Sequence, residues 1–210
     1  MSSSFSALHK VVVLGVPLVL GVLEMAHPAF WPPQSVIGTL MPIRDWWTLL
    51  HLLQVPLFAL LGVAAWLLVR DRPGRAAQVS RRAIAVFTII YPAFDAAVGI
   101  ASGVILRTID TEDPAQLAAL EIGLEALFWG PLTGFMAVVG SVSWLVALIA
   151  AAVSWRQAGA PWYPVAALVL AGLLLGIAHV RPLGPLACLF FLVGAAWVVF
   201  KASGSRVATA

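Results

Sequence analysis

Long apolar runs alternate with short polar stretches along this chain. Six runs approach or exceed the roughly 20 residues, at about 1.5 Å each, that a helix needs to cross a bilayer. They lie at about residues 11–26, 46–69, 83–106, 124–153, 162–179 and 186–200. The runs are continuous in Leu, Val, Ala and Ile, whereas the strands of an outer-membrane barrel alternate polar and apolar residues. The pattern predicts an all-α fold, a polytopic integral membrane bundle of six transmembrane helices that forms a single domain over residues 1–210.

The composition agrees with a membrane protein and excludes several other classes. Hydrophobic residues make up 62% of the chain and charged residues only 10%, against about 25% in a typical soluble domain. Mean hydropathy is +1.01. So little charge excludes a soluble enzyme, a disordered chain and a nucleic-acid-binding module. The chain has one cysteine, Cys188, so a disulfide scaffold is excluded as well.

The basic residues predict the orientation of the helices, because cytoplasmic connections carry an excess of Lys and Arg. In a six-helix topology nine basic residues fall on one side: Lys10, Arg70, Arg72, Arg75, Arg81, Arg82, Arg156, Lys201 and Arg206. Three fall on the other side: Arg44, Arg107 and Arg181. We therefore expect both termini to be cytoplasmic and the protein to lie in the inner or plasma membrane. We expect the first helix to be retained, because residues 25–28, Met-Ala-His-Pro, make a poor signal-peptidase site.

Small residues and one proline affect how the helices pack. Three glycine pairs have the small-xxx-small spacing that lets helix backbones approach closely: Gly99 with Gly103, Gly130 with Gly134, and Gly172 with Gly176. Such faces predict tight packing inside the bundle, and they would also serve a homo-oligomer. Pro131 either begins the fourth helix or kinks a longer one. A longer helix would include Glu121 and Glu125 and could bring either carboxylate to a polar site.

Ionisable residues lie at a similar depth in four of the predicted helices. Counting about 1.5 Å per residue from the cytoplasmic ends places Glu24 and Asp95 about 20 Å into a hydrocarbon core of about 30 Å. His51 lies at about 22 Å and His179 at about 26 Å, and His27 is about one turn above Glu24. Charged groups inside a membrane helix cost about 2.5–3.5 kcal/mol each, so they persist mainly where they face a cavity or each other. We expect these groups to form one polar pocket in the outer half of the bilayer.

The residue types in this predicted pocket are typical of a metal site. Three histidines with Glu24 and Asp95 suit zinc, iron or copper better than magnesium or calcium, which prefer oxygen ligands alone. Glu24 and His27 have the Glu-x-x-His spacing of carboxylate-bridged metal bundles. The predicted metal ligands are therefore Glu24, His27, His51, Asp95 and His179. Asp95 with Tyr91 is the candidate for proton transfer, and Gln54 could orient a ligand.

Four functions fit these residues. The first is a metal-dependent membrane enzyme that acts on a lipid or another apolar substrate. The second is a haem-binding redox protein, with His51 and His179 as axial ligands. A proton- or cation-coupled carrier would use the buried carboxylates, although the inner half of the predicted bundle carries few polar groups. A non-catalytic membrane scaffold is the fourth. A purely structural polar network would also explain the buried residues.

Overall fold

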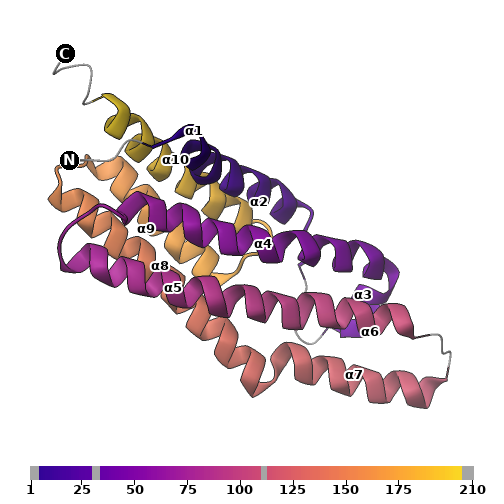
Figure 1. The fold of residues 1–210 in the computed structure, drawn as a ribbon. Coiled ribbons are helices and arrows are strands. Elements are labelled where there is room, and N and C mark those ends of the chain that lie inside the picture. The colour runs from indigo at the N-terminus through magenta and orange to yellow at the C-terminus, as the bar shows by residue number, and fades with distance from the viewer. Residues whose placement is uncertain (1–4, 30–33, 110–112, 205–210) are drawn as a thin grey trace.

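A computed structural model describes residues 5–29, 34–109 and 113–204, and within these ranges it contains helices and no strands (Figure 1). Arg206, counted above among the cytoplasmic residues, lies outside these ranges. The helices are α1 (Ala7–Lys10), α2 (Val16–Met25), α3 (Val36–Leu40), α4 (Arg44–Val69), α5 (Arg75–Asp95), α6 (Ser102–Thr108), α7 (Pro114–Trp129), α8 (Pro131–Gln157), α9 (Trp162–Ile177) and α10 (Leu183–Gly204). Two π-helical stretches, η1 (Val11–Gly15) and η3 (Ala96–Ala101), and the 3-10 helix η2 (Met41–Ile43) join neighbouring helices end to end.

Five of the described helical segments are long and apolar enough to cross a membrane: Ala7–Met25, Val36–Val69, Arg75–Thr108, Pro114–Gln157 and Leu183–Lys201. Four of them contain or extend the predicted spans at one or both ends, and the first begins at Ala7 and ends one residue short of the prediction. The segment Trp162–Ile177 is apolar but has only 16 residues. The protein is thus a helical, strongly apolar bundle of the membrane type over its described residues.

The fourth predicted span is part of a longer, kinked segment. Gly130 has extended backbone angles (φ −69°, ψ 162°) and separates α7 from α8. Pro131 occupies the first turn of α8, where its missing N–H group leaves no hydrogen bond unmade. Helix α7 begins at Pro114, and the Asp113 carboxylate accepts a hydrogen bond from the Ala115 N–H. The kink places Glu121 and Glu125 on α7, outside the main bundle.

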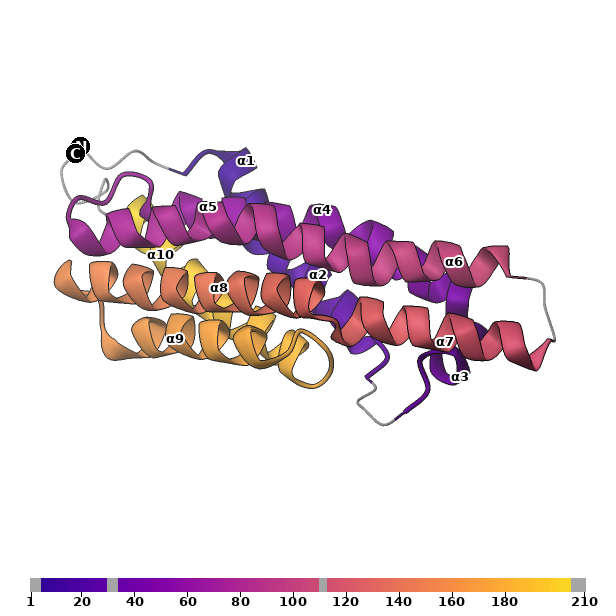
Figure 2. The same ribbon diagram turned by 90° about the horizontal axis from the view of Figure 1, so that it is seen from below.

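Six helices pack as a closed ring. Each helix contacts the next one in the order α2, α4, α5, α8, α9 and α10, and α10 also contacts α2. Neighbours along the chain are thus neighbours in space, as in an up-and-down bundle. Figure 2 shows the long α4 and α5 side by side and α7 continuing the line of α8 beyond the kink. The interior of the ring is apolar and contains Phe58, Phe87, Trp144 and Phe191, each almost fully buried.

Basic and aromatic side chains gather at one end of the bundle, which we call the basic end. Its described residues include His9, Arg70, Arg72 and Trp155. The Arg70 guanidinium lies 3.2 Å from Nε2 of His9, so α1 meets the end of α4 here. The Arg72 guanidinium stacks 4.8 Å from the ring centre of Trp155, near the end of α8. Helices α3, α6 and α7 lie at the opposite end (Figure 1).

A second apolar cluster joins the helices of that opposite end. It consists of Val36, Leu40, Trp47, Leu106 and Leu124, from α3, α4, α6 and α7. One carboxylate strengthens the contact: Glu121 on α7 accepts hydrogen bonds of 2.6 and 2.9 Å from the N–H groups of Val36 and Ile37. Residues 27–45, the connection between the first two predicted spans, therefore contain a short helix that is held against α7.

Glycine allows the close approach of α4 and η3. A Cβ atom placed on Gly99 would lie 1.9 Å from Cδ2 of His51, so the His51 ring lies directly on the η3 backbone. A Cβ atom placed on Gly103 would likewise lie 2.3 Å from Oγ1 of Thr48. Gly172 faces Leu145 and Leu148 of α8. These three glycines pack against helices of the same chain, as the small-xxx-small spacing predicts for a tight bundle.

Candidate functional site

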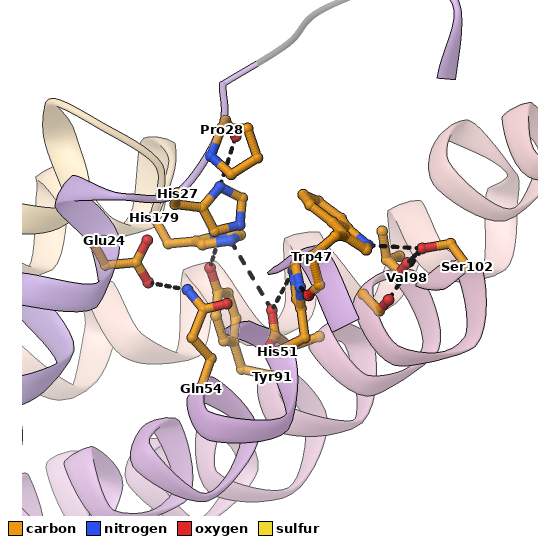
Figure 3. Close-up of polar contacts among 12 residues, drawn as sticks. Glu24, His27, Pro28, Trp47, His51, Gln54, Tyr91, Val98, Ser102 and His179 are labelled. Carbon is orange, nitrogen blue, oxygen red and sulfur yellow. Dashed lines mark hydrogen bonds and ion pairs between the residues drawn. The ribbon is translucent and has the colours of Figure 1, made fainter. Parts of the chain in front are cut away.

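Five ionisable side chains meet near the ends of α2 and α9. Figure 3 labels four of them, Glu24, His27, His51 and His179. Glu24 is in the last turn of α2, and His27 follows that helix by two residues. His51 lies on α4, and Asp95 is the last residue of α5 before the π-helical turn η3. His179 follows the end of α9. The structure therefore brings together all five residues that the sequence places at a common depth.

These side chains are buried to a degree that is unusual for ionisable groups. Glu24 is fully buried, and His27, His51 and Asp95 are each 2% exposed. The side chain of His179 is 16% exposed. A charge or a polar atom in such surroundings is costly unless a partner compensates it. The partners of each atom therefore decide what the cluster can do.

Carbonyl groups fix the protons on two of the histidines. Nδ1 of His27 lies 2.7 Å from the Pro28 carbonyl oxygen, and Nδ1 of His51 lies 2.7 Å from the Trp47 carbonyl oxygen. A carbonyl oxygen only accepts hydrogen bonds, so each Nδ1 carries the proton and donates it. In the neutral ring Nε2 then keeps its lone pair. A backbone carbonyl that accepts a hydrogen bond from the other ring nitrogen is a usual partner of a metal-binding histidine.

Two further hydrogen bonds hold His179 and Glu24. Nδ1 of His179 lies 2.9 Å from the Tyr91 hydroxyl oxygen. The side-chain amide of Gln54 donates a 2.7 Å hydrogen bond to Oε1 of Glu24. Each contact uses one atom of its residue and leaves the other directed into the cluster (Figure 3). Gln54 thus orients Glu24, a role that the sequence left open between His51 and another ligand.

Three of the remaining atoms have no hydrogen-bond partner although they are buried: Oε2 of Glu24, Nε2 of His27 and Nε2 of His179. Potential ligand atoms of these same three residues lie within 4.8 Å of one another. A divalent ion that binds nitrogen and oxygen at about 2.0–2.2 Å would be within reach of all three. Among the described residues, this Glu24–His27–His179 group is the one whose spacing could hold a metal ion.

Asp95 and His51 stand beside this group. Oδ1 of Asp95 lies 4.0 Å from Nε2 of His179 and 3.9 Å from Nε2 of His51. Both distances are too long for a direct hydrogen bond and leave room for an intervening atom. Oδ2 of Asp95 is buried and has no hydrogen-bond partner. The carboxylate therefore lies between two imidazoles and contacts neither directly.

His27 follows the end of the first membrane-spanning segment, and burial lowers the pKa of its imidazole to about 3. The neighbouring His51 lowers this pKa further, and the hydrogen bond to Pro28 opposes the shift. At neutral pH the ring is therefore uncharged. The uncharged imidazole is the form that can bind a metal ion.

A cavity of about 230 Å³ adjoins the cluster. His27, His51, Asp95 and His179 form its polar side. The rest of its wall is mainly apolar and includes Phe94, Phe128, Trp129, Ala137 and Ile177. The cavity is open on one side, so a ligand could reach the cluster from outside the bundle.

Other acidic residues named above do not join the cluster. Glu121 accepts hydrogen bonds from the N–H groups at the start of α3, and Glu125 is exposed on α7.

One residue of the site was not expected from the sequence. A Cβ on Gly184 would lie 1.5 Å from the His179 carbonyl oxygen and 3.2 Å from Cβ of Glu24. Glycine here lets the start of α10 approach both residues, and the Pro-Leu-Gly-Pro sequence 182–185 was the available signal for a tight turn.

The fold and the cluster together define a class: an apolar helical bundle of the membrane type with a buried Glu–His–His group that could bind a metal ion. No family model, no curated protein and no solved structure matches this chain. Any assignment of function therefore depends on the chemistry of the site.

Proposed function

We propose that this protein is a metal-dependent membrane enzyme that hydrolyses a lipid or another apolar substrate. Glu24, His27 and His179 bind one divalent transition metal ion, with zinc the best match and iron or copper the alternatives. Two histidines and one glutamate with an open fourth position are a known ligand set of catalytic zinc. The observation that carries the proposal is that potential ligand atoms of these three residues lie within 4.8 Å of one another, and that each residue also has a buried atom without a hydrogen-bond partner.

The remaining groups of the cluster supply proton transfer and positioning. An ion held by Glu24, His27 and His179 would make a water molecule more acidic than bulk water, and Asp95 would be the group that accepts its proton. Asp95 would then return this proton to the leaving group, as the water oxygen bonds to the electrophilic atom of the substrate and the bond to the leaving group breaks. The Asp95 carboxylate is 4.0 Å from the proposed ligand atom of His179, close enough to contact a water on the same ion. Tyr91 and Gln54 position His179 and Glu24 through the hydrogen bonds described above.

We propose that the bundle crosses the inner or plasma membrane six times with both termini in the cytoplasm. The ring of six helices supports this topology, because α9 packs between α8 and α10 like the longer helices. The collection of Arg70, Arg72 and His9 at one end supports the orientation. In this arrangement the cluster lies in the outer half of the bilayer.

Three alternatives receive less support from the structure. A cavity of about 230 Å³ is smaller than the roughly 300–1,000 Å³ pockets of drug-sized ligands, and haem is larger than those ligands. A carrier would need polar groups on both sides of the cluster. Toward the basic end, however, Phe58 and Phe87 pack against Tyr91 with ring centres 4.9 and 5.2 Å apart. A scaffold role would leave the convergent ligand atoms unexplained.

Metal analysis of the purified protein tests the proposal. We expect close to one zinc, iron or copper ion per chain, and we expect Glu24→Gln and His27→Ala to abolish that stoichiometry. His9→Ala is the matched control, because His9 contacts Arg70 at the basic end. A wild-type protein that takes up no transition metal in equilibrium dialysis, or that binds it equally well in all three variants, would overturn the proposed metal centre.

A further inference from the structure

The exposed face of α8 shows where the hydrocarbon core meets the bundle. Large apolar side chains recur along it every three or four residues: Leu132, Phe135, Val138, Val142, Val146, Ile149 and Val153. From Leu132 to Val153 the helix rises about 32 Å, close to the roughly 30 Å thickness of the hydrocarbon core. Trp129, the last residue of α7, precedes this stripe by three residues and is of the type found at membrane interfaces. In the proposed topology the stripe spans the hydrocarbon core on this side.

Residues that line the cavity from α8 and α9 lie inside these limits. Ala137 lines the cavity five residues after Leu132, which is about 8 Å below the outer edge. Ile177 lines it from α9, about 22 Å above Trp162 at the other end of that helix. Trp129 and Ile177 are also 45% and 69% exposed on the outside of the bundle. The cavity thus opens sideways, between α8 and the end of the short helix α9, at a level where lipid tails surround the protein.

The size of the cavity limits what it can enclose. About 230 Å³ is less than the space that a drug-sized ligand needs, so a whole lipid does not fit. The reacting group of a lipid fits beside His27 and His179, while its chain extends past Trp129 and Ile177 into the bilayer. The short α9 is then functional, since a longer helix would cover this opening.

The charges at the cavity favour an uncharged reacting group. Among the described residues that line it, none is a lysine or arginine, and Asp95 is part of the wall. Glu24 lies directly behind His27 and His179. A phosphate group would bring further negative charge toward two buried carboxylates, with only the bound ion and Arg181, which acts electrostatically on His27, to balance it. A carbonyl group carries no net charge and can be polarised by a bound metal ion.

We propose that the substrate is a neutral single-chain acyl lipid, an ester or an amide, that enters from the bilayer through the opening between α8 and α9. This inference rests on the proposed function for its chemistry. The water oxygen bonds to the acyl carbonyl carbon, the bond to the ester oxygen or amide nitrogen breaks, and that atom takes the proton. The products are a carboxylic acid and an alcohol or amine, and no oxidant or reductant is needed.

Photolabelling in vesicles tests the entry route independently of the metal and of turnover. The full-length protein is placed in phosphatidylcholine vesicles with a trace of monoacylglycerol that carries a diazirine in its chain. We expect saturable labelling of the segments around Ala137 and Ile177. Ala137→Trp narrows the opening and should reduce this labelling by an order of magnitude. Val138→Trp is the matched control, because Val138 is the next residue and faces lipid with 61% of its surface exposed.

Further variants and a competition experiment distinguish the ways in which the proposal could be wrong. Ile177→Trp narrows the opening from α9 at an exposed position, so it serves if Ala137→Trp does not fold. His27→Ala should remain labelled, since it removes a proposed metal ligand and leaves the opening intact. Equal labelling of the opening variants and the Val138→Trp control would overturn the entry route. Labelling that does not saturate would also overturn it. Equal competition by monoacylglycerol and by lysophosphatidic acid of the same chain length would overturn the preference for a neutral group.

Discussion

Groups outside the proposed ligand set orient the nitrogen and oxygen atoms of the cluster. The Pro28 and Trp47 carbonyl oxygens hold protons on Nδ1 of His27 and His51, so the lone pairs at Nε2 face inward. Gln54 occupies one oxygen of Glu24 and leaves the other free. A structural network would be expected to pair these inward atoms with each other. Here Nε2 of His27 and the second oxygen of Glu24 have no hydrogen-bond partner, which favours a ligand as their common partner.

Removal of the Gln54 amide tests this arrangement. In Gln54→Leu the Glu24 carboxylate loses its 2.7 Å hydrogen bond and its fixed orientation. Loss of such an outer partner reduces metal affinity by roughly 10–100-fold. A competitive titration against a chromophoric chelator would measure the change. Gln78→Leu is the control, because Gln78 is exposed near the other end of α5. An unchanged affinity in Gln54→Leu would show that Gln54 does not position a ligand.

At the scale of the helices, the ends and irregularities of the elements place the site. Helix α2 ends at Met25 and α9 at Ile177, and the backbone after each end carries a histidine into the cluster. Helix α5 changes to the π-helical turn η3 directly after Asp95. Single-turn π-helices within α-helices are frequent at functional sites, because they turn side chains away from the regular direction.

Gly99 on η3 is the most restrictive of these positions. Alanine at this position would place its Cβ about where the edge of the His51 ring now lies, so the ring must move. Overpacking of this kind costs about 1–3 kcal/mol. We expect Gly99→Ala to lower the thermal midpoint and to reduce hydrolysis, measured on a detergent-solubilised acyl ester. Gly134→Ala has no neighbour within 4 Å of the added Cβ and should leave both quantities near wild type. If the two variants behave alike, the close contact between η3 and His51 is not important.

The sequence was sufficient for the all-helical, apolar character of the fold and for grouping the five ionisable residues, since apolar runs and helical rise determine both. It could not show which of these atoms face one another. That depends on the rotation of each helix, which is set by close contacts such as Gly99 with His51 and Gly184 with His179. The α3 helix was also not predicted, because its five residues are held by Glu121, 85 positions away from Val36 in the chain. Contacts of this range leave no periodic signal.

At the scale of the whole molecule, the length of α9 affects both the topology and the position of the site. Its 16 residues rise about 24 Å, less than the hydrocarbon core, so in the proposed topology its end would lie below the outer edge of the membrane. His179 can then be buried inside the bilayer and still belong to a connection rather than to a helix. The same shortness creates the side opening of the cavity. A protein with five crossings, in which α9 did not span, would place His179 and the basic end on the same side.

Thiol labelling on both sides of α9 distinguishes five crossings from six. Gln157→Cys and Arg181→Cys are both exposed and stand at the two ends of this helix. Each is made in a Cys188→Ala background, where the buried native thiol is removed. In intact cells an impermeant maleimide should label Arg181→Cys and should label Gln157→Cys only after the membrane is opened. Six crossings require this difference, since α9 must then carry the chain from the basic end to the outer side. Labelling of both residues from one side would show that the bilayer does not lie between them. The proposed position of the cavity within the hydrocarbon core would then be wrong as well.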